Sequence, residues 1–122
     1  MKILLADDSM FMRKLLAGIL LKNGHTVVAE ATNGQEAFDQ YKRYKPDLVF
    51  MDMNMAVVNG LEGVKLIKAY DPKAMIIMCS SMGQECYRMD SYIAGAFDYI
   101  VKPFQASRIQ EVLSRVKSMS VM

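Results

Sequence analysis

Three aspartates and one lysine stand where short apolar segments of this sequence end. Asp7 and Asp8 directly follow one such segment. Asp52 ends a second segment, and Lys102 follows a third. Short apolar runs of this kind are typical of buried β-strands. Because the carboxyl ends of strands form the ligand crevice of an open parallel sheet, these side chains predict a site for a divalent cation and a phosphoryl group.

The carboxylates indicate a hard cation, because three of them in one crevice repel each other unless positive charge neutralises them. An oxygen-only ligand set suits Mg²⁺, which takes one or two carboxylates together with phosphate oxygens and water. A structural explanation competes for the adjacent pair, since Asp is favoured as a helix cap. Ser9 can fill that role as well, and a cap does not require two aspartates. The presence of Asp52 and Lys102 at other strand ends favours the metal site.

Two further positions near the crevice have both a functional and a structural explanation. Lys102 precedes Pro103, and a cis bond there would turn the chain sharply and aim the ammonium into the crevice. The alternative is a solvated lysine in a loop. Ser80 and Ser81 follow the fourth apolar segment, where a hydroxyl could donate to a phosphoryl oxygen. A turn-forming serine is an equally good explanation of that pair.

Five strand patterns alternate with five helix patterns along the chain. We predict strands near residues 2–6, 26–30, 47–51, 75–79 and 97–101. We predict helices near residues 9–22, 34–44, 60–69, 84–94 and 106–117. Strict alternation with short connections implies right-handed crossovers and a five-stranded parallel sheet with helices on both faces. The sequence therefore predicts an α/β fold in one domain over residues 1–122, with a frayed tail at residues 118–122.

Local features support these helices. The first carries a wide apolar stripe at helical period, with Phe11 and Leu15 in one row and Leu16 beside them. Gly24 and Gly95 fit the left-handed position just past a helix end, where the absence of a Cβ removes the steric cost. The three Asn-Gly pairs adjoin helical patterns, so we do not expect them to form hairpins.

Charge and composition exclude several classes of partner. The 122 residues carry a net charge of +2, with 52% hydrophobic and 23% charged residues, which is ordinary for a globular protein. No basic run exceeds two residues, so nucleic acid is not an expected partner. No segment approaches the roughly 20 apolar residues of a membrane span. The chain begins with a strand pattern instead of a signal peptide, so we expect a cytoplasmic protein without membrane insertion.

Cysteine, histidine and methionine do not indicate a second site. Cys79 and Cys86 match no disulfide or metal-binding pattern and are predicted to be free thiols. His25 is the single histidine, without partner ligands nearby, and is predicted to stand at the start of a strand. Most of the twelve methionines lie in or beside apolar runs, which favours core filling over an adaptable binding surface.

The motifs of this chain, taken in order, resemble those of a response-regulator receiver domain of the single-domain, CheY-like chemotaxis type. The resemblance covers essentially the whole chain and rests on Asp7-Asp8-Ser9, Met51-Asp52-Met53-Asn54-Met55, Asn59-Gly60, Ser80-Ser81, Ala94-Gly95-Ala96 and Tyr99-Ile100-Val101-Lys102-Pro103-Phe104. Each motif is weak alone, whereas this order and spacing are highly specific. The resemblance implies a flavodoxin-like (βα)5 fold with strand order 2-1-3-4-5.

The resemblance also implies a phosphorylation site with a metal ion. Asp52 would be the phosphoacceptor for a histidine kinase or a small phosphodonor. Asp8, Asp52 and the backbone carbonyl of Asn54 would coordinate Mg²⁺, with Asp7 contributing through water. This agrees with the chemistry inferred from the residues, because phosphoryl transfer depends on positioning and charge neutralisation.

Further roles implied by the resemblance concern the phosphorylated state. Ser80 would hydrogen-bond the phosphoryl group, and Lys102 would ion-pair with it. Tyr99 resembles an aromatic switch that turns inward when Ser80 is drawn to the phosphate. Asn54 and Met82 would flank the path of the attacking water, and neither offers a carboxylate as a general base.

One position departs from the family pattern. Ala56 stands where the family usually has proline, which frees φ and restores an N–H in the loop beside Asp52. The departure bears on the rigidity of that loop and leaves the expected chemistry unchanged.

The favoured function is a phosphorylation-controlled binding module, expected to be monomeric, that catalyses at most its own phosphorylation and dephosphorylation. Its expected partners are a histidine kinase, a downstream target such as the flagellar motor switch, and a phosphatase.

A first alternative is a Mg²⁺-dependent aspartyl-phosphate phosphatase or phosphotransferase. Such enzymes carry a second Asp two residues after the nucleophile, where this chain has Asn54. A second alternative is a flavin-binding electron carrier, whose phosphate the pair Asp7-Asp8 would repel.

Overall fold

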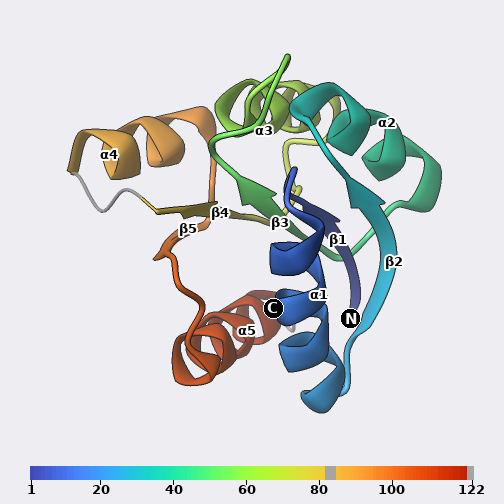
Figure 1. Cartoon of the computed structure of the whole chain (residues 1–122). Helices are drawn as coiled ribbons and strands as arrows, with labels where there is room; N and C mark the ends of the chain where they lie inside the picture. Colours follow the sequence, from blue (N-terminus) through green and yellow to red (C-terminus); the bar gives the residue numbers. More distant parts are fainter. Residues whose placement is uncertain (82–84, 121–122) are drawn as a thin grey trace.

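The sheet of this protein contains five parallel strands. The computed structural model describes residues 1–81 and 85–120 (Figure 1). The strands are β1 (Lys2–Ala6), β2 (Thr26–Ala31), β3 (Leu48–Asp52), β4 (Ile76–Ser80) and β5 (Asp98–Val101). Their order in the sheet is β2-β1-β3-β4-β5, and all four pairings are parallel. The predicted fold class and strand order are therefore confirmed.

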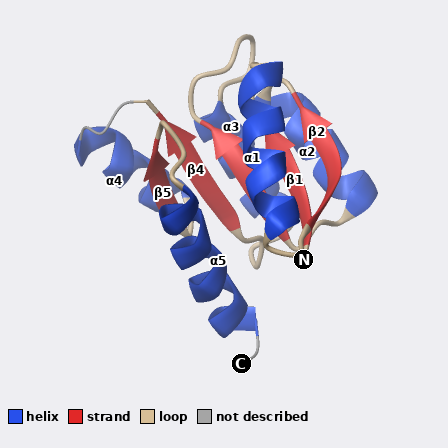
Figure 2. Ribbon diagram, turned by 60° about the horizontal axis from the view of Figure 1, so that its bottom comes forward, coloured by secondary structure: helices blue, strands red, loops and turns tan. Residues whose placement is uncertain are grey.

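A helix follows each strand. The helices are α1 (Met10–Lys22), α2 (Gly34–Tyr44), α3 (Gly60–Tyr70), α4 (Glu85–Ala94) and α5 (Ala106–Ser120). Figure 2 shows α1 and α5 on one face of the sheet and α2 and α3 on the other. Helix α4 lies on the side of α3 (Figure 1) and contacts it.

Polar side chains cap the first three helices. Ser9, Asn33 and Asn59 each accept a hydrogen bond from a backbone N–H of the first helical turn. Two of the three Asn-Gly pairs therefore begin helices instead of hairpins, because asparagine is among the best N-cap residues. Gly24 and Gly95 have φ of 81° and 113°, which confirms their predicted left-handed conformation after α1 and α4.

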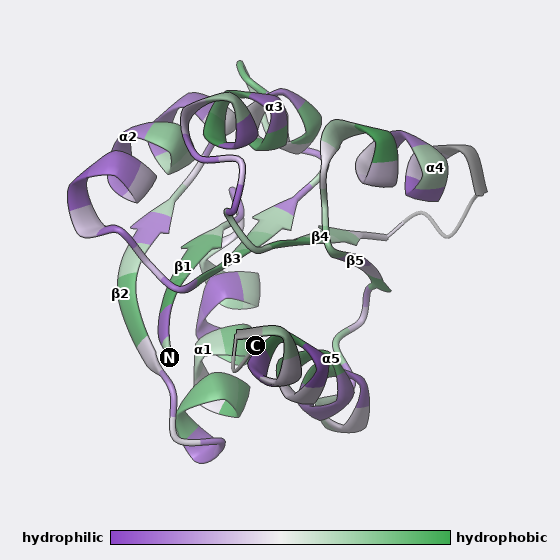
Figure 3. Cartoon of the chain, turned by 180° about the vertical axis from the view of Figure 1, so that it is seen from behind, coloured by the Kyte–Doolittle hydropathy of each residue, from purple (hydrophilic) through white to green (hydrophobic). Residues whose placement is uncertain are grey.

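Two hydrophobic layers cover the two faces of the sheet. Alternate residues of β1 point to opposite faces, so that Leu4 packs toward α2 and α3 while Ile3 and Leu5 pack toward α1 and α5. Figure 3 shows hydrophobic residues along the strands and hydrophilic residues on the outer surfaces of α2 and α5. Among the methionines expected to fill the core, Met51, Met53 and Met78 are buried, and Met75 is partly buried against the layer on the α1 and α5 side.

The apolar stripe of α1 is wider than the surface that covers it. Leu16 and Leu20 are buried, whereas Phe11 is 73% and Leu15 41% exposed. Helix α1 lies at the outside of one layer, so the sheet and α5 cover only part of its circumference. Phe11 and Leu15 thus remain at the surface, contrary to what the periodicity indicates, whereas Ile19 of the same row is partly buried against the core.

Most predicted boundaries lie within one residue of the observed ones. The last helix is the exception, because residues 118–120, expected in a frayed tail, continue α5 to Ser120. Met82 and residues 121–122 lie outside the described residues, as does the side chain of Cys86. Cys79 is a buried free thiol. No helix in the described part of the chain is long and apolar enough to cross a membrane.

Candidate functional site

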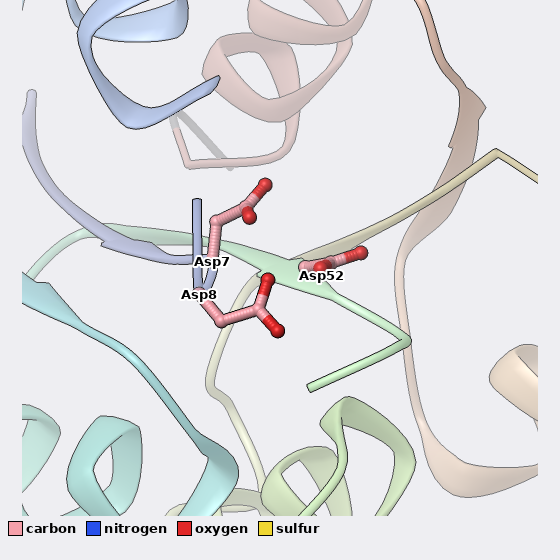
Figure 4. A group of neighbouring side chains, drawn as sticks. All are labelled: Asp7, Asp8 and Asp52. Carbon is pink, nitrogen blue, oxygen red and sulfur yellow. The ribbon is translucent and has the colours of Figure 1, made fainter. Parts of the chain in front are cut away.

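Three carboxylates meet at the carboxyl ends of β1 and β3. Asp7, Asp8 and Asp52 each place an oxygen within 4.8 Å of the others. Figure 4 shows the three side chains close together, with Asp7 and Asp8 on neighbouring positions of one segment and Asp52 on another. Asp7 and Asp52 are only 7% and 5% exposed, whereas Asp8 is exposed. In residues 1–81 and 85–120 this is the one cluster of three or more metal-type donors.

A single ammonium bridges the two buried carboxylates. Lys102 Nζ lies 2.7 Å from Asp7 Oδ2 and 3.3 Å from Asp52 Oδ1. The Lys102–Pro103 bond is cis, which the sequence allowed but did not decide. Burial by itself would lower the pKa of Lys102, but its hydrogen bond to Asp7 and the charge of Asp52 outweigh burial and raise that pKa. The ammonium therefore keeps its charge over the physiological range.

The Asp52 carboxyl is held in an environment that disfavours its charge. Burial raises its pKa most strongly, and the neighbouring charge of Asp7 raises it further. Lys102 and the backbone N–H of Asn54, 3.4 Å from Asp52 Oδ1, offset part of this effect. One ammonium thus only partly compensates three clustered carboxyl groups, and added positive charge would favour the ionised form of Asp52.

The donor set fits Mg²⁺. All three side chains offer hard carboxylate oxygens, and the exposed Asp8 leaves room for the water molecules that Mg²⁺ retains. The oxygens lie within 4.8 Å of one another, and opposite ligands of an octahedral Mg²⁺ ion are roughly 4 Å apart. This spacing accommodates an ion that reaches at least one carboxylate through water. The position of Asn54 next to Asp52 is fixed by the backbone hydrogen bond described above.

Ser80 and Tyr99 lie on adjacent strands. In the parallel register of β4 and β5, Met78 pairs with Tyr99 and Ser80 with Val101. Because alternate residues of a strand share a face, the side chains of Ser80 and Tyr99 lie on the same face of the sheet. Both are buried. The Lys102 N–H donates to the Ser80 carbonyl at 2.8 Å, so the backbone joins the ends of β4 and β5.

The loop that follows Asp52 packs directly against it. The Gly60 N–H donates to the Met53 carbonyl at 3.0 Å. A Cβ at Gly60 would lie 2.0 Å from the Asp52 carbonyl oxygen, so only glycine allows this approach. Val57, almost fully exposed, has φ of 68°. A β-branched residue is strained in this conformation. The structure thus retains a tight loop although Ala56 replaces the family's proline.

Sequence reasoning missed Arg13. Its NH1 group donates to the Asp7 carbonyl at 2.6 Å, and its Nε lies 2.8 Å from Glu30 Oε1. Arg13 also lines a cavity of about 10 Å³ beside Asp7 and Asp52, which is room for roughly one water molecule. The sequence did contain a signal for this contact, because Arg13 lies about one turn into the helix that follows the two aspartates, within reach of them.

Comparison with known proteins agrees with this geometry. The family model of the response regulator receiver domain matches residues 3–114. The chain is 49% identical to the chemotaxis protein CheY of Thermotoga maritima, over 94% of this chain and 96% of that protein. It is 50% identical to the chemotaxis protein CheY of Bacillus subtilis, over 93% of this chain and 95% of that protein.

A solved structure is also similar over nearly the whole chain. It is the CheX-CheY-BeF3-Mg+2 complex from Borrelia burgdorferi, with a TM-score of 0.89 and 34% identity. The match covers 99% of this chain and 90% of that one. Fold, strand order and motifs therefore agree with sequence similarity that extends through the acidic cluster and Lys102. The chain belongs to the response regulator receiver domain family.

Proposed function

We propose that this receiver domain accepts a phosphoryl group on Asp52 from a histidine kinase, with Mg²⁺ bound, and then presents a changed surface to a protein partner. The observation that carries the proposal is the Asp52 carboxylate, buried among Asp7, Asp8 and Lys102 at the edge of the sheet. The relatives named as chemotaxis proteins support a role in chemotaxis or motility.

In this mechanism Asp52 is a nucleophile. One of its carboxylate oxygens attacks the phosphorus of a phosphohistidine, the P–N bond breaks, and an aspartyl phosphate forms. Asp8, Asp52 and the backbone carbonyl of Asn54 would hold Mg²⁺, with Asp7 acting through water. When bound, the ion supplies charge neutralisation for the transferring phosphoryl oxygens.

Two side chains then stabilise the phosphoryl group. Lys102 Nζ already lies 3.3 Å from Asp52 Oδ1, so it can reach an oxygen of a group attached to Asp52 without a large movement. A charge-assisted hydrogen bond of this kind is about twice as strong as a neutral one. Ser80, the last residue of β4, would donate its hydroxyl to another phosphoryl oxygen.

The acceptor is tested by mass spectrometry after incubation with acetyl phosphate and Mg²⁺. Wild-type protein should gain one phosphoryl group, and Asp52→Asn should gain none, because the amide is not a nucleophile of comparable strength. Full labelling of Asp52→Asn would place the acceptor elsewhere. Calorimetry on Asp8→Ala should show that the heat of Mg²⁺ binding is lost, and unchanged heat would move the metal site away from Asp8.

We further propose that Tyr99 transmits the change to the surface. Its ring is buried, and the Arg88 guanidinium lies 5.1 Å from the ring centre. Movement of Ser80 toward a phosphoryl group would alter the space that the ring can occupy, and with it the face formed by α4, β5 and α5. The Borrelia burgdorferi relative is named as a complex with CheX, which supports a partner protein such as a phosphatase or the motor switch.

A pull-down with beryllofluoride-treated protein tests this switch. Tyr99→Ala should accept a phosphoryl group on Asp52 normally and yet retain less partner than treated wild type. Tyr99→Phe, which keeps the ring, is the matched control and should retain more partner than Tyr99→Ala. A Tyr99→Ala protein that gains partner as strongly as wild type on treatment would assign the signal to another element.

A further inference from the structure

A guanidinium on α1 holds the peptide group that joins two residues of the acidic cluster. The Arg13 NH1 group donates to the Asp7 carbonyl at 2.6 Å. That carbonyl belongs to the peptide unit between Asp7 and Asp8. Because a peptide unit is planar, fixing its oxygen restricts ψ of Asp7 and φ of Asp8 together. The direction in which both carboxylates leave the backbone is thereby set.

Strand β2 fixes this arrangement from the other side. Arg13 Nε lies 2.8 Å from Glu30 Oε1, and the Arg13 side chain is 13% exposed. The Asp7 N–H donates to the Ala31 carbonyl at 3.0 Å. Both backbone groups of Asp7 are therefore tied to β2, one directly and the other through Arg13 and Glu30.

Asp8 depends on this backbone more than its neighbour does. The Asp7 carboxylate accepts hydrogen bonds from the Ser9 N–H at 2.9 Å and from Lys102 Nζ at 2.7 Å. Within residues 1–81 and 85–120, no hydrogen bond or ion pair holds the carboxylate of Asp8. The backbone position from which it extends toward Asp52 is set by the peptide that Arg13 holds.

We propose that Arg13 is a positioning residue for the Mg²⁺ site, which acts through the Asp7–Asp8 peptide and itself contacts neither the ion nor the phosphoryl group. This inference rests on the proposed Mg²⁺ site. Mg²⁺ demands near-ideal octahedral geometry, so a fixed backbone at Asp8, which limits where its carboxylate can lie, strengthens the binding of the ion. Residues that orient metal ligands typically account for a 10–100-fold change in metal affinity.

Positioning and simple electrostatics predict opposite results when Arg13 is neutralised. Loss of a positive charge beside an acidic cluster would by itself strengthen cation binding. Loss of the clamp on the peptide would weaken it. Arg13→Gln should therefore raise the Mg²⁺ dissociation constant about tenfold. The loss should be smaller for Ca²⁺, which tolerates irregular coordination, so the ratio of Mg²⁺ to Ca²⁺ affinity should fall.

The experiment is calorimetric titration of the full chain with MgCl₂ and separately with CaCl₂, without phosphodonor. Arg13→Lys keeps the charge but lacks the planar fork that reaches two acceptors, so its Mg²⁺ affinity should also fall. Lys14→Gln removes the same charge from the next, exposed position of α1 and is the matched control. It should bind Mg²⁺ at least as tightly as wild type.

The proposal would be overturned if Arg13→Gln bound Mg²⁺ as tightly as wild type, or more tightly. A weaker Mg²⁺ affinity with an unchanged Mg²⁺ to Ca²⁺ ratio would also overturn it, since that indicates general loosening. If Arg13→Gln does not fold, Glu30→Gln takes its place. It removes the negative charge from the half-exposed partner of Arg13 and weakens the ion pair that orients the guanidinium. Because the lost charge by itself weakens the binding of both cations, the readout is the ratio of Mg²⁺ to Ca²⁺ affinity, which should fall by a smaller factor than in Arg13→Gln. An unchanged ratio in that variant would overturn the proposal.

The two proposals fail in different ways. Wild-type protein that binds no Mg²⁺ would overturn both the metal site and the role of Arg13. Wild-type protein whose Mg²⁺ binding requires Asp8 but is insensitive to both Arg13 and Glu30 substitutions would overturn only the positioning role.

Discussion

Asp52 is placed where its charge is useful for chemistry and unfavourable for folding. Its carboxyl group is almost fully buried next to Asp7, and one ammonium is shared between the two. Burial is the largest cause of its raised pKa. A carboxylate held in this way is available as a nucleophile and attracts a cation. Its ionisation, however, lowers the stability of the folded state.

This cost gives a pH-dependent prediction for Asp52→Asn without Mg²⁺. A raised pKa means that the folded state holds the Asp52 proton more tightly than the unfolded state does. The stability contributed by the protonated form is therefore lost as pH rises through the folded pKa. At pH 7 the asparagine variant should unfold at higher urea concentration than wild type. The difference should shrink toward zero as pH falls below the ordinary Asp pKa of about 3.9.

Urea unfolding followed by circular dichroism in EDTA measures this difference. Asp90→Asn, at an exposed position of α4, is the matched control and should leave the midpoint unchanged at both pH values. Equal midpoints for Asp52→Asn and wild type at pH 7 would contradict the unfavourable ionisation of Asp52.

Among the elements, the connection from β3 to α3 most directly positions the site. Gly60→Ala would place a Cβ 2.0 Å from the Asp52 carbonyl oxygen, so the loop has to move. We expect a loss of about 1–3 kcal/mol in unfolding free energy, as for overpacked sites. Gly18→Ala in α1 meets no atom within 4 Å and should add about 0.5–1 kcal/mol through helix propensity.

Thermal unfolding of the two variants checks this pair. Because the shift at Gly60 also moves Asp52, Gly60→Ala should be phosphorylated more slowly by acetyl phosphate, and Gly18→Ala at the wild-type rate. If Gly60→Ala were as stable as Gly18→Ala, the loop between β3 and α3 would be able to move away from the added Cβ without loss of unfolding free energy.

The end of α3 is tied to α2 by one side-chain hydrogen bond. The Tyr41 hydroxyl donates to Asp71 Oδ2 at 2.6 Å, and this bond is the main cause of the lowered pKa of Asp71. A lowered pKa contributes stability that is present above the unfolded pKa and is lost as pH falls through the folded one. Tyr41→Phe should therefore cost about 0.5–1 kcal/mol at pH 7, a modest value because Asp71 is partly exposed.

The same substitution should cost less in acid. Denaturant unfolding at pH 7 and at pH 3 measures the two differences between Tyr41→Phe and wild type. A penalty that is independent of pH would mean that the Tyr41 hydroxyl does not stabilise the fold through the charged Asp71 carboxylate.

At the scale of the whole molecule, α5 is fastened to the sheet by a buried carboxylate. Asp98 at the start of β5 pairs with Arg108, 3.1 Å away. It also pairs with Arg115, which lies about two helical turns further along α5. It also accepts the Tyr99 N–H at 2.7 Å. The carboxylate has two cationic partners, so either arginine alone still neutralises it.

This redundancy predicts strongly non-additive losses. Arg108→Met or Arg115→Met alone should cost about 1 kcal/mol, since one guanidinium remains. The double variant leaves Asp98 without a cation and should lose roughly 3–5 kcal/mol, as when a buried pair is broken. A double-mutant cycle by urea unfolding measures the coupling. Strict additivity would mean that the two arginines do not act on the same buried charge.

Much of this arrangement could be predicted from the sequence, because it depends on local periodicity. Short apolar runs and helical stripes placed nearly every element boundary within a residue or so, and their alternation implied a parallel sheet. Since strand ends of such a sheet share one edge, Asp7, Asp52 and Lys102 could be expected together. These inferences need only the geometry of neighbouring residues along the chain.

Other features were decided only by how distant segments pack. The periodicity of α1 does not tell which row is covered, and the packing of α1 against the sheet left Phe11 exposed. Arg13 has ordinary spacing in its helix, and only the approach of β2 brings Glu30 to it. The sequence by itself thus determined the order of elements and the types of side chain at the site. The tertiary structure decided which partners they have, because contacts between residues far apart in the chain depend on packing that no local pattern records.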